Sequence, residues 1–391
     1  MDAKKERKNS FFHELLHPQK TVVFRTRGGI DKTFLIIVLM LVAFGSVMII
    51  SAGYVYAAKR FDDSFYFAKR QFIYAVIGVA VMILLANIDY TVMKRFALPV
   101  YIVSMILLVL VLIPGVGVTA KGATRWLSLG PISVQPSEVA KFAIVLMMAS
   151  YISFFQAKMK KFTYGILIPA LFIGVICTLT VLEHHMSGTI IIFLIGACMV
   201  FLAGADPKWL GAIGGVFGVG ALGIILFTDY TKDRIDAWLH QENDLVGKGW
   251  QPYQSLLAIG SGGLLGVGLG NSYQKHLWLP EPQNDFIFAV VCEELGLIGA
   301  AALILIFFFL IRRGIIIARR APDTFSSVLC AGLTAKVGIQ AILNIAVVTA
   351  SIPTTGIALP FFSYGGSALV MQLAEMGIIL SISRYSRTRE L

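Results

Sequence analysis

The sequence predicts an all-α membrane protein, a polytopic bundle of about ten transmembrane helices. Three observations support this fold class. Hydrophobic residues make up 57% of the 391 residues and charged residues only 14%, and the mean hydropathy is +0.79. Apolar runs of about 20 residues, long enough to cross a bilayer core of ~30 Å as a helix, recur along nearly the whole chain. Alternating strand patterns are absent, and helices satisfy their own backbone polar groups in lipid.

The positions of the apolar runs predict the spans. In chain order we expect them at about 33–52, 72–88, 97–115, 136–155, 163–182, 188–204, 208–228, 286–311, 324–350 and 355–383. The first run, with ~20 apolar residues, is longer than the apolar region of a signal peptide, so we expect an uncleaved helix. Residues 33–384 then form a single membrane domain between a basic cytoplasmic tail, 1–32, and a short cytoplasmic tail, 385–391.

The distribution of Lys and Arg predicts the orientation of the bundle. With the N-terminus inside and Lys208 at the edge of span seven counted with the inside connections, these carry 21 Lys and Arg in about 71 residues, and the outside connections carry 10 in about 105. Basic residues concentrate on the cytoplasmic side of membrane proteins, so both termini are expected inside. Residues 229–285 then form one long extracellular loop between spans seven and eight. The same rule explains the net charge of +11 without nucleic acid.

Several polar side chains fall inside the predicted spans, where charge is costly and indicates a functional site by default. Glu138 and Lys141 stand three apart, so a helix places them on one face as an ion pair. A purely structural pair is an equally good interpretation. Polar residues at helical spacing in spans nine and ten are Lys336, Gln340, Asn344, Gln372 and Glu375. Such stripes are more often contacts between helices than catalysts.

Three carboxylates lie close together in "WLPEPQNDFIFAVVCEELG", residues 278–296. Asp285 ends the polar loop at the outer mouth of span eight, where it is either a functional carboxylate or a helix N-cap. Glu293 and Glu294 project about 100° apart on a helix, and Glu293 lies ~12 Å deeper than Asp285. We expect both glutamates to pair with partners such as Lys336 or polar backbone.

Other outer segments supply positive charge and glycine. "KGATRWLSLG" places Lys121 and Arg125 between spans three and four, and arginine suits phosphate groups. The Gly-rich run 260–275 follows no strand, so close backbone approach or a re-entrant turn explains it better than nucleotide binding. Pro and Gly in 353–370 predict a broken or re-entrant helix. His184 and His185 lack a third ligand at useful spacing, so no metal site is predicted.

Four segments together resemble the SEDS family, which includes RodA, FtsW and SpoVE. They are "GATRWLSLGPISVQPSEVAKFA", "QSLLAIGSGGLLGVGLGNSYQK", "LPEPQNDFIFAVVCEELGLIG" and "TGIALPFFSYGGSAL". Their order and their spread over ten spans match the family, and the run ending at Lys275 resembles FtsW and SpoVE more than RodA. Two departures stand out. Gln283-Asn284 replaces the usual His-Thr, and "EHHMS" at 183–187 replaces a Gln-Pro-Asp pattern, so no role is carried over to that Asp position.

The resemblance implies an inverting membrane glycosyltransferase that polymerises lipid II into peptidoglycan on the outer face of the bacterial cytoplasmic membrane, for division or sporulation. Asp285 matches the family's essential aspartate. A lipid diphosphate is a good leaving group, so one carboxylate can serve as general base without a paired acid. Candidates for diphosphate binding are Arg125, Lys121 and Lys275, with a divalent cation, Mg²⁺ or Mn²⁺, as the other source of positive charge.

The remaining polar residues are expected to support the site electrostatically. They are Glu138, Lys141, Glu293, Glu294, Lys336 and Asn344. The family also implies as partners lipid II, the undecaprenyl-linked nascent glycan, a class B penicillin-binding protein and other divisome proteins. Two other functions stay open at this stage. One is a lipid II flippase, which depends most on central residues such as Lys336, and the other is a non-catalytic scaffold for a transpeptidase.

Overall fold

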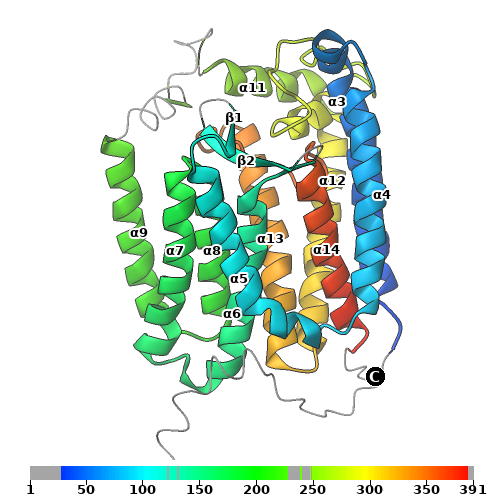
Figure 1. The fold of residues 1–391 in the computed structure, drawn as a ribbon. Helices are drawn as coiled ribbons and strands as arrows, with labels where there is room; N and C mark the ends of the chain where they lie inside the picture. The colour runs from blue at the N-terminus through cyan, green and yellow to red at the C-terminus, as the bar shows by residue number, and fades with distance from the viewer. Residues whose placement is uncertain are drawn as a thin grey trace, which may run out of the picture.

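A bundle of apolar helices forms the body of the protein, and a short helix and a small β-sheet lie across its upper end (Figure 1). The computed structural model describes residues 28–120, 123–129, 132–227, 238–239, 247 and 249–385. The helices of the bundle are α3 (Lys32–Phe61), α4 (Tyr66–Asn87), α5 (Thr91–Leu112), α6 (Pro136–Phe155), α7 (Ile168–Leu182), α8 (Met186–Leu202), α9 (Pro207–Phe227), α12 (Ile287–Arg320), α13 (Thr324–Val348) and α14 (Gly366–Ser383). A π-helical turn, Thr163–Leu167, precedes α7.

The predicted spans each coincide with one of these helices, and α6 has the predicted bounds. Eight of the described helices are long and apolar enough to cross a membrane, and α8 is a shorter apolar helix of 17 residues. The chain is therefore a multi-pass membrane protein. Most of the two predicted tails lies outside the described residues, since 1–27 and 386–391 are not described. Lys121 also lies outside them.

Three spans differ from their predicted bounds by nine residues or more, and the first of them, α3, ends at Phe61 rather than 52. Span ten begins at Gly366 rather than 355, because the preceding segment contains Pro353 and Pro360 and has Phe361 at φ 66°. Span eight continues to Arg320 rather than 311, since the charged residues at 312–313 do not end the helix. Their second member, Arg313, is paired with Asp31 instead, with Nη2 to Oδ2 at 2.8 Å.

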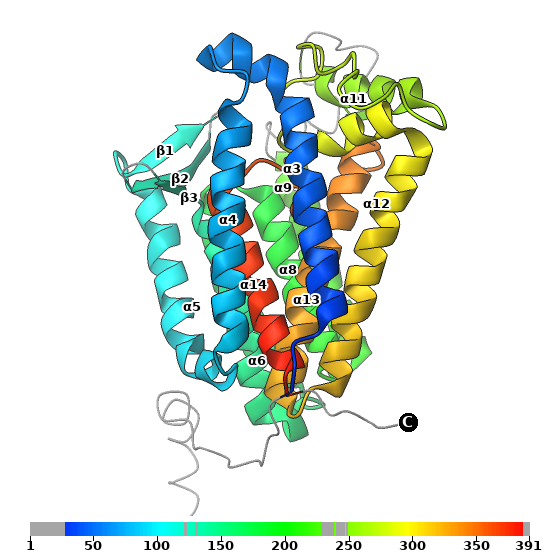
Figure 2. The ribbon, with the colours of Figure 1, turned by 90° about the vertical axis from the view of Figure 1, so that its right-hand side faces the viewer.

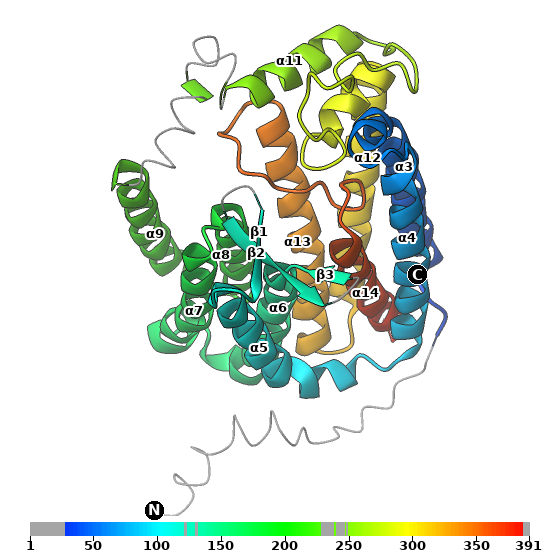
Figure 3. The same ribbon diagram turned by 45° about the horizontal axis from the view of Figure 1, so that its top comes forward.

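Two elements of the upper end were not predicted. An antiparallel sheet of β1 (Gly117–Ala120), β2 (Ala123–Leu129) and β3 (Ile132–Val134) forms where no strand pattern was found. It contacts α5, α6 and the start of α14 (Figure 3). Within the predicted long loop, α11 (Trp250–Gly262) packs on α12.

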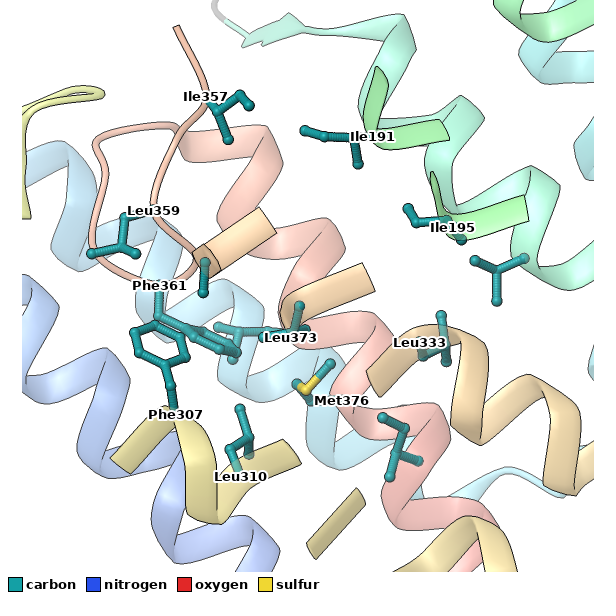
Figure 4. Close-up of a cluster of buried hydrophobic side chains, with 14 of the residues drawn as sticks. Ile191, Ile195, Phe307, Leu310, Leu333, Ile357, Leu359, Phe361, Leu373 and Met376 are labelled. Atoms are coloured by element: carbon teal, nitrogen blue, oxygen red, sulfur yellow. The ribbon is translucent and has the colours of Figure 1, made fainter. Parts of the chain in front are cut away.

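Part of the hydrophobic core lies among α8, α12, α13 and α14 (Figure 4). Ile191, Phe307, Leu333 and Leu373 contribute from these helices. Phe361 contributes from the non-helical segment before α14, so this segment is part of the core and not a surface loop. Because this segment is not helical, it cannot satisfy all of its backbone carbonyls by itself. The surrounding helices must therefore donate hydrogen bonds to the others.

At the lower end of the bundle, contacts of Asp31 link the start of α3 to α12 and α14. In Figure 2, α3 lies between α4 and α12. Asp31 caps α3 by accepting from the backbone N–H of Phe34. Its carboxylate also pairs with Arg313 of α12, and its own N–H donates to the Ser383 hydroxyl of α14. The Asp31–Arg313 pair therefore marks a common level for α3 and α12 at this end.

Candidate active site

Asp285 lies in the turn before α12, half-buried, at the upper end of the bundle. The N-cap of α12 is Phe286, and no side chain caps this helix, so Asp285 does not serve as its N-cap. The Asp285 backbone carbonyl accepts from the Asn344 side-chain amide at 2.7 Å. A methyl group added at Gly356 would be 3.6 Å from Oδ2 of Asp285, so the carboxylate lies beside this glycine.

Asn344 joins the turn that carries Asp285 to the non-helical segment 352–365. The same Nδ2 that donates to Asp285 donates to the carbonyl of Ile357 at 2.6 Å. One turn below, Gln340 donates to the carbonyl of Ala358 at 3.0 Å. The predicted stripe on α13 therefore satisfies carbonyls of the broken helix, as backbone in a membrane bundle requires.

The residues that replace the family's His-Thr pair also contact this segment. The Gln283 carbonyl accepts from the backbone N–H of Tyr364 at 2.9 Å, which links the start of α12 to the start of α14. Gln283 is buried, and no hydrogen bond reaches its Oε1. The Asn284 side-chain amide donates to the Glu281 carboxylate at 2.8 Å. The exchanged pair therefore holds the backbone that precedes Asp285, through Tyr364 and Glu281.

Two buried ion pairs lie deeper in the bundle. Lys141 pairs with Glu138 at 2.5 Å on α6, as predicted, and lies 3.4 Å from Oε1 of Gln340 on α13. Lys336 on α13 pairs with Glu375 on α14 at 2.5 Å. Through Gln340, the Glu138–Lys141 pair contacts the same stripe that holds the carbonyls near Asp285. These charges thus connect α6, α13 and α14.

Arg125 projects from β2 to the turn between α7 and α8. Its Nη2 donates to the carbonyl of His184. Burial raises the pKa of the neighbouring Glu183 carboxyl to about 8, against the opposing effect of Arg125. Burial lowers the pKa of His185 to about 3, and the positive charges of Arg125 and Lys141 add to this effect. Arg125 therefore stands beside a carboxyl that is largely protonated at neutral pH.

Glu183 is a feature that the sequence analysis missed. Only 2% of its surface is exposed, and neither carboxylate oxygen has a hydrogen-bond partner. The available signal was an acidic residue at the end of an apolar run, but no role was assigned to it. Among the described residues no group of three or more His, Cys, Asp or Glu side chains that could hold a metal ion includes His184 or His185.

Glu293 and Glu294 serve the Gly-rich loop and not Lys336. Glu293 accepts from the Ser272 hydroxyl and from the backbone N–H of Tyr273 at 2.8 Å. Glu294 pairs with the buried Lys275 ammonium at 3.0 Å. Both carboxylates were expected to meet a partner such as Lys336 or polar backbone, and the structure supplies backbone and a second lysine.

The pairing with Glu294 makes Lys275 a weaker candidate for diphosphate binding than Arg125 or Lys121. Only 4% of the surface of Lys275 is exposed. Its ammonium donates to the carbonyl of Gly270, to the Ser51 hydroxyl and to the Glu294 carboxylate. Lys275 therefore already has its full set of three acceptors. Arg125 is the remaining described candidate.

A cavity of about 350 Å³ opens at the lower end of the bundle, between the ends of α6 and α8 and the α12–α13 connection. Asp323 and Thr324 line it, and Thr324 donates to Gln156 at 2.7 Å. Asn344, beside Asp285, lies at the opposite end of α13. This cavity is therefore distinct from the candidate active site.

Known proteins resemble the chain over almost its whole length. The model of the cell cycle protein family FtsW/RodA/SpoVE matches residues 31–388. Stage V sporulation protein E of Bacillus subtilis (strain 168) is 43% identical over 359 residues, covering 91% of this chain and 98% of the relative. The probable peptidoglycan glycosyltransferase FtsW of Geobacter sulfurreducens (strain DL-1 / KN400) is 42% identical over 361 residues, covering 90% and 96%.

Solved structures share the fold. A chain from "Structural coordination of polymerization and crosslinking by a peptidoglycan synthase complex" superposes with a TM-score of 0.75 at 27% identity, covering 92% of this chain and 99% of that one. Rod shape determining protein RodA of Thermus thermophilus gives a TM-score of 0.67 at 26% identity, covering 91% and 97%. The chain belongs to the FtsW/RodA/SpoVE family.

Proposed function

We propose that this protein is a peptidoglycan glycosyltransferase that polymerises lipid II at the outer face of the bacterial cytoplasmic membrane, in septal wall synthesis. The observation that carries the proposal is the position of Asp285. Its backbone carbonyl is fixed by Asn344, and its carboxylate lies at the upper end of the bundle beside Gly356. The relatives named glycosyltransferases and the basic residues of the inside connections support the reaction and the face.

In the proposed reaction Asp285 is the general base. Its carboxylate accepts the proton of the 4-hydroxyl of the acceptor lipid II as that oxygen attacks the anomeric carbon of the chain-bearing donor. The bond to the polyprenyl diphosphate breaks as the new bond forms, so an α-diphosphate gives a β-1,4 link. The diphosphate leaves as an anion and needs no general acid.

Arg125 is the proposed ligand of the departing diphosphate. A guanidinium can donate two parallel hydrogen bonds to phosphate oxygens, and it stays charged at every relevant pH. It stands on a strand at the same end of the bundle as Asp285. Lys121 lies four residues earlier and outside the described residues, and it remains a second candidate. No step is assigned to a divalent cation, since the described residues hold no group of three His, Cys, Asp or Glu side chains that could bind one.

A class B penicillin-binding protein is the proposed partner. A chain of similar fold occurs in a structure described as a peptidoglycan synthase complex that coordinates polymerization and crosslinking. A polymerase and a crosslinking enzyme act on the same glycan strand, so their association gives both access to the product. The partner would contact the upper end, where the product forms.

The decisive experiment is polymerisation of lipid II by the purified protein in liposomes, with products resolved on a gel. Asp285→Asn should lower the rate by about 10²–10⁴-fold, because an amide cannot accept the proton. Asp62→Asn, the matched control, removes a carboxylate from the exposed connection after α3 and should keep full activity. Full activity in Asp285→Asn would exclude the general-base role.

The partner and a chelator are tested in the same assay. Addition of the penicillin-binding protein should raise the rate of the wild type and leave Asp285→Asn inactive. Loss of wild-type activity with the chelator, restored by Mg²⁺ or Mn²⁺, would show that a metal ion accompanies the diphosphate.

A further inference from the structure

The Gly263–Gly270 loop after α11 is built into a break in α12. Gly296 has φ 65° and interrupts the helix there. Four backbone hydrogen bonds join the two segments: Leu297 N–H to Gly263 at 2.9 Å, Ile298 N–H to Leu264 at 3.2 Å, Val267 N–H to Glu293 at 3.0 Å and Gly268 N–H to Glu294 at 3.0 Å. The loop therefore supplies hydrogen-bond partners that a continuous helix would have supplied itself.

Four side chains at this junction are apolar and largely exposed. Leu264 and Leu265 are 68% and 78% exposed, and Leu297 and Ile298 next to them are 61% and 60% exposed. The sequence from 249 to 274 contains no charged residue. A contiguous exposed apolar surface of this kind indicates contact with lipid or with another protein.

Distances along the helices place this surface within the bilayer. Leu297 lies 16 residues above Arg313, or about 24 Å at 1.5 Å per residue. A hydrocarbon core is ~30 Å thick, so Leu297 falls several Å short of its upper boundary if the Asp31–Arg313 pair marks the lower one. Ser51 of α3, which donates to Glu294, lies 20 residues above Asp31, or about 30 Å. The glutamates thus lie near the upper boundary and the leucines just below it.

We propose that Leu264 and Leu265 are inserted in the acyl chains of the outer leaflet, so that the Gly263–Gly270 loop is a lipid-embedded wedge. Non-helical backbone at this depth requires internal hydrogen bonds, and the broken α12 provides them. The exposed apolar surface of the wedge continues down α12 through Phe308, which is 56% exposed. The Trp250 and Trp278 rings, 6.1 Å apart at the upper end, suit the headgroup region above it.

A spin label tests this placement without any use of enzymatic activity. Leu265→Cys is labelled with a nitroxide, in a protein whose four native cysteines are replaced by alanine, and reconstituted alone in phosphatidylcholine–phosphatidylglycerol liposomes. Power saturation measures collisions with oxygen, which concentrates in lipid, and with a nickel chelate, which stays in water. The ratio of the two should exceed the aqueous control several-fold.

Two matched positions calibrate the measurement. Phe308→Cys reports the lipid-facing surface of α12, and Asp62→Cys reports water above α3. A ratio at Leu265→Cys equal to that of Asp62→Cys would overturn the proposal. So would low collision rates with both reagents, because they would show that protein covers the loop. Leu264→Cys provides the same test if the first variant fails to fold.

Discussion

At the scale of single residues, Asn344 determines where Asp285 stands. Its amide donates to the carbonyls of both Asp285 and Ile357, which belong to segments far apart in the chain. On Asp285 the contact is made by the backbone carbonyl and not by the carboxylate. Asn344 acts as a positioning residue under the proposed function.

Asn344→Leu should therefore lower kcat with little effect on KM. The two carbonyls lose their donors, and a shift of about 1 Å at a general base costs on the order of 10²-fold in rate. The measurement is steady-state polymerisation of lipid II, with thermal unfolding in detergent as the test of folding. Thr349→Val is the control, since the hydrogen bonds of its hydroxyl are local, to Ile345, Ala346 and Ser351, and their loss should change neither constant. Unchanged kcat in Asn344→Leu would rule out a positioning role.

Glu183 predicts a dependence of stability on pH. Its folded pKa of about 8 lies above the ordinary value of 4.5, so the folded protein keeps a proton that the unfolded chain releases. This contribution to stability is complete below pH 4.5 and is lost as the pH rises through 8. His185, with its folded pKa lowered to about 3, contributes stability that rises between pH 3 and 6.5. The two effects therefore have opposite signs.

The difference between the wild type and Glu183→Gln from pH 6.5 to 8 isolates Glu183, because His185 is present in both proteins and its effect cancels. The wild type should lose about 1–2 kcal/mol of unfolding free energy relative to Glu183→Gln across this window. Thermal unfolding in detergent at pH 6.5, 7.25 and 8 measures the difference. Parallel curves for the two proteins would show that Glu183 ionises normally.

At the scale of elements, the junction of the Gly263–Gly270 loop with α12 depends on glycine. A methyl group at Gly266 would lie 2.2 Å from the carbonyl oxygen of Glu294, and one at Gly296 would lie 2.4 Å from the backbone N of Gly266. The sequence analysis expected close backbone approach or a re-entrant turn from the glycines alone. The close approach is confirmed.

Gly266→Ala should thus destabilise the protein more than Gly270→Ala. Both glycines have positive φ, 82° and 85°, so both substitutions carry backbone strain of about 1–3 kcal/mol. Only Gly266 meets another backbone, since nothing lies within 4 Å of a methyl group at Gly270. We expect Gly266→Ala to cost at least about 2 kcal/mol more, seen as a lower Tm in detergent. Equal Tm values would show that the loop moves away freely.

The sequence predicted helices better than their irregular parts. An apolar run predicts a membrane helix because its length and hydropathy are enough to identify it. The bounds of α6 were predicted to the residue. The strands β1 to β3 have 4, 7 and 3 residues, too short for an alternating pattern to stand out. The break at Gly296 was also missed, because its hydrogen bonds come from another segment and leave the apolar run intact.

At the scale of the whole molecule, the partners of the buried charges could not be predicted. Lys336 and Glu375 stand on different helices, 39 residues apart, and Lys275 pairs with Glu294 across a loop. Sequence patterns report which residues share one helix face, as for Glu138 and Lys141, but not how faces of separate helices meet. The candidate base was found because it ends a polar loop next to a span, which is a local signal strengthened by family resemblance.

The Lys336–Glu375 pair distinguishes a polymerase from a lipid II flippase. Lys336→Met alone should destabilise the protein by about 3–5 kcal/mol, because it leaves Glu375 buried without its partner. The double variant Lys336→Met, Glu375→Met should recover most of that stability and polymerise lipid II at near the wild-type rate. Thermal unfolding and the gel assay measure the two effects. A stable double variant without polymerase activity would give this pair a direct role in function.

The break in α12 also bears on how the chain is assembled during synthesis. Gly263 and Leu264 leave the ribosome before Leu297 and Ile298. Their carbonyls accept hydrogen bonds from the N–H groups of these two later residues. The closure of a loop of this length costs about 2 kcal/mol more than the closure of a hairpin, because the cost grows only with the logarithm of loop length. We expect the junction to form as α12 enters the membrane, ahead of α13 and α14, so that a broken helix is never left to insert alone.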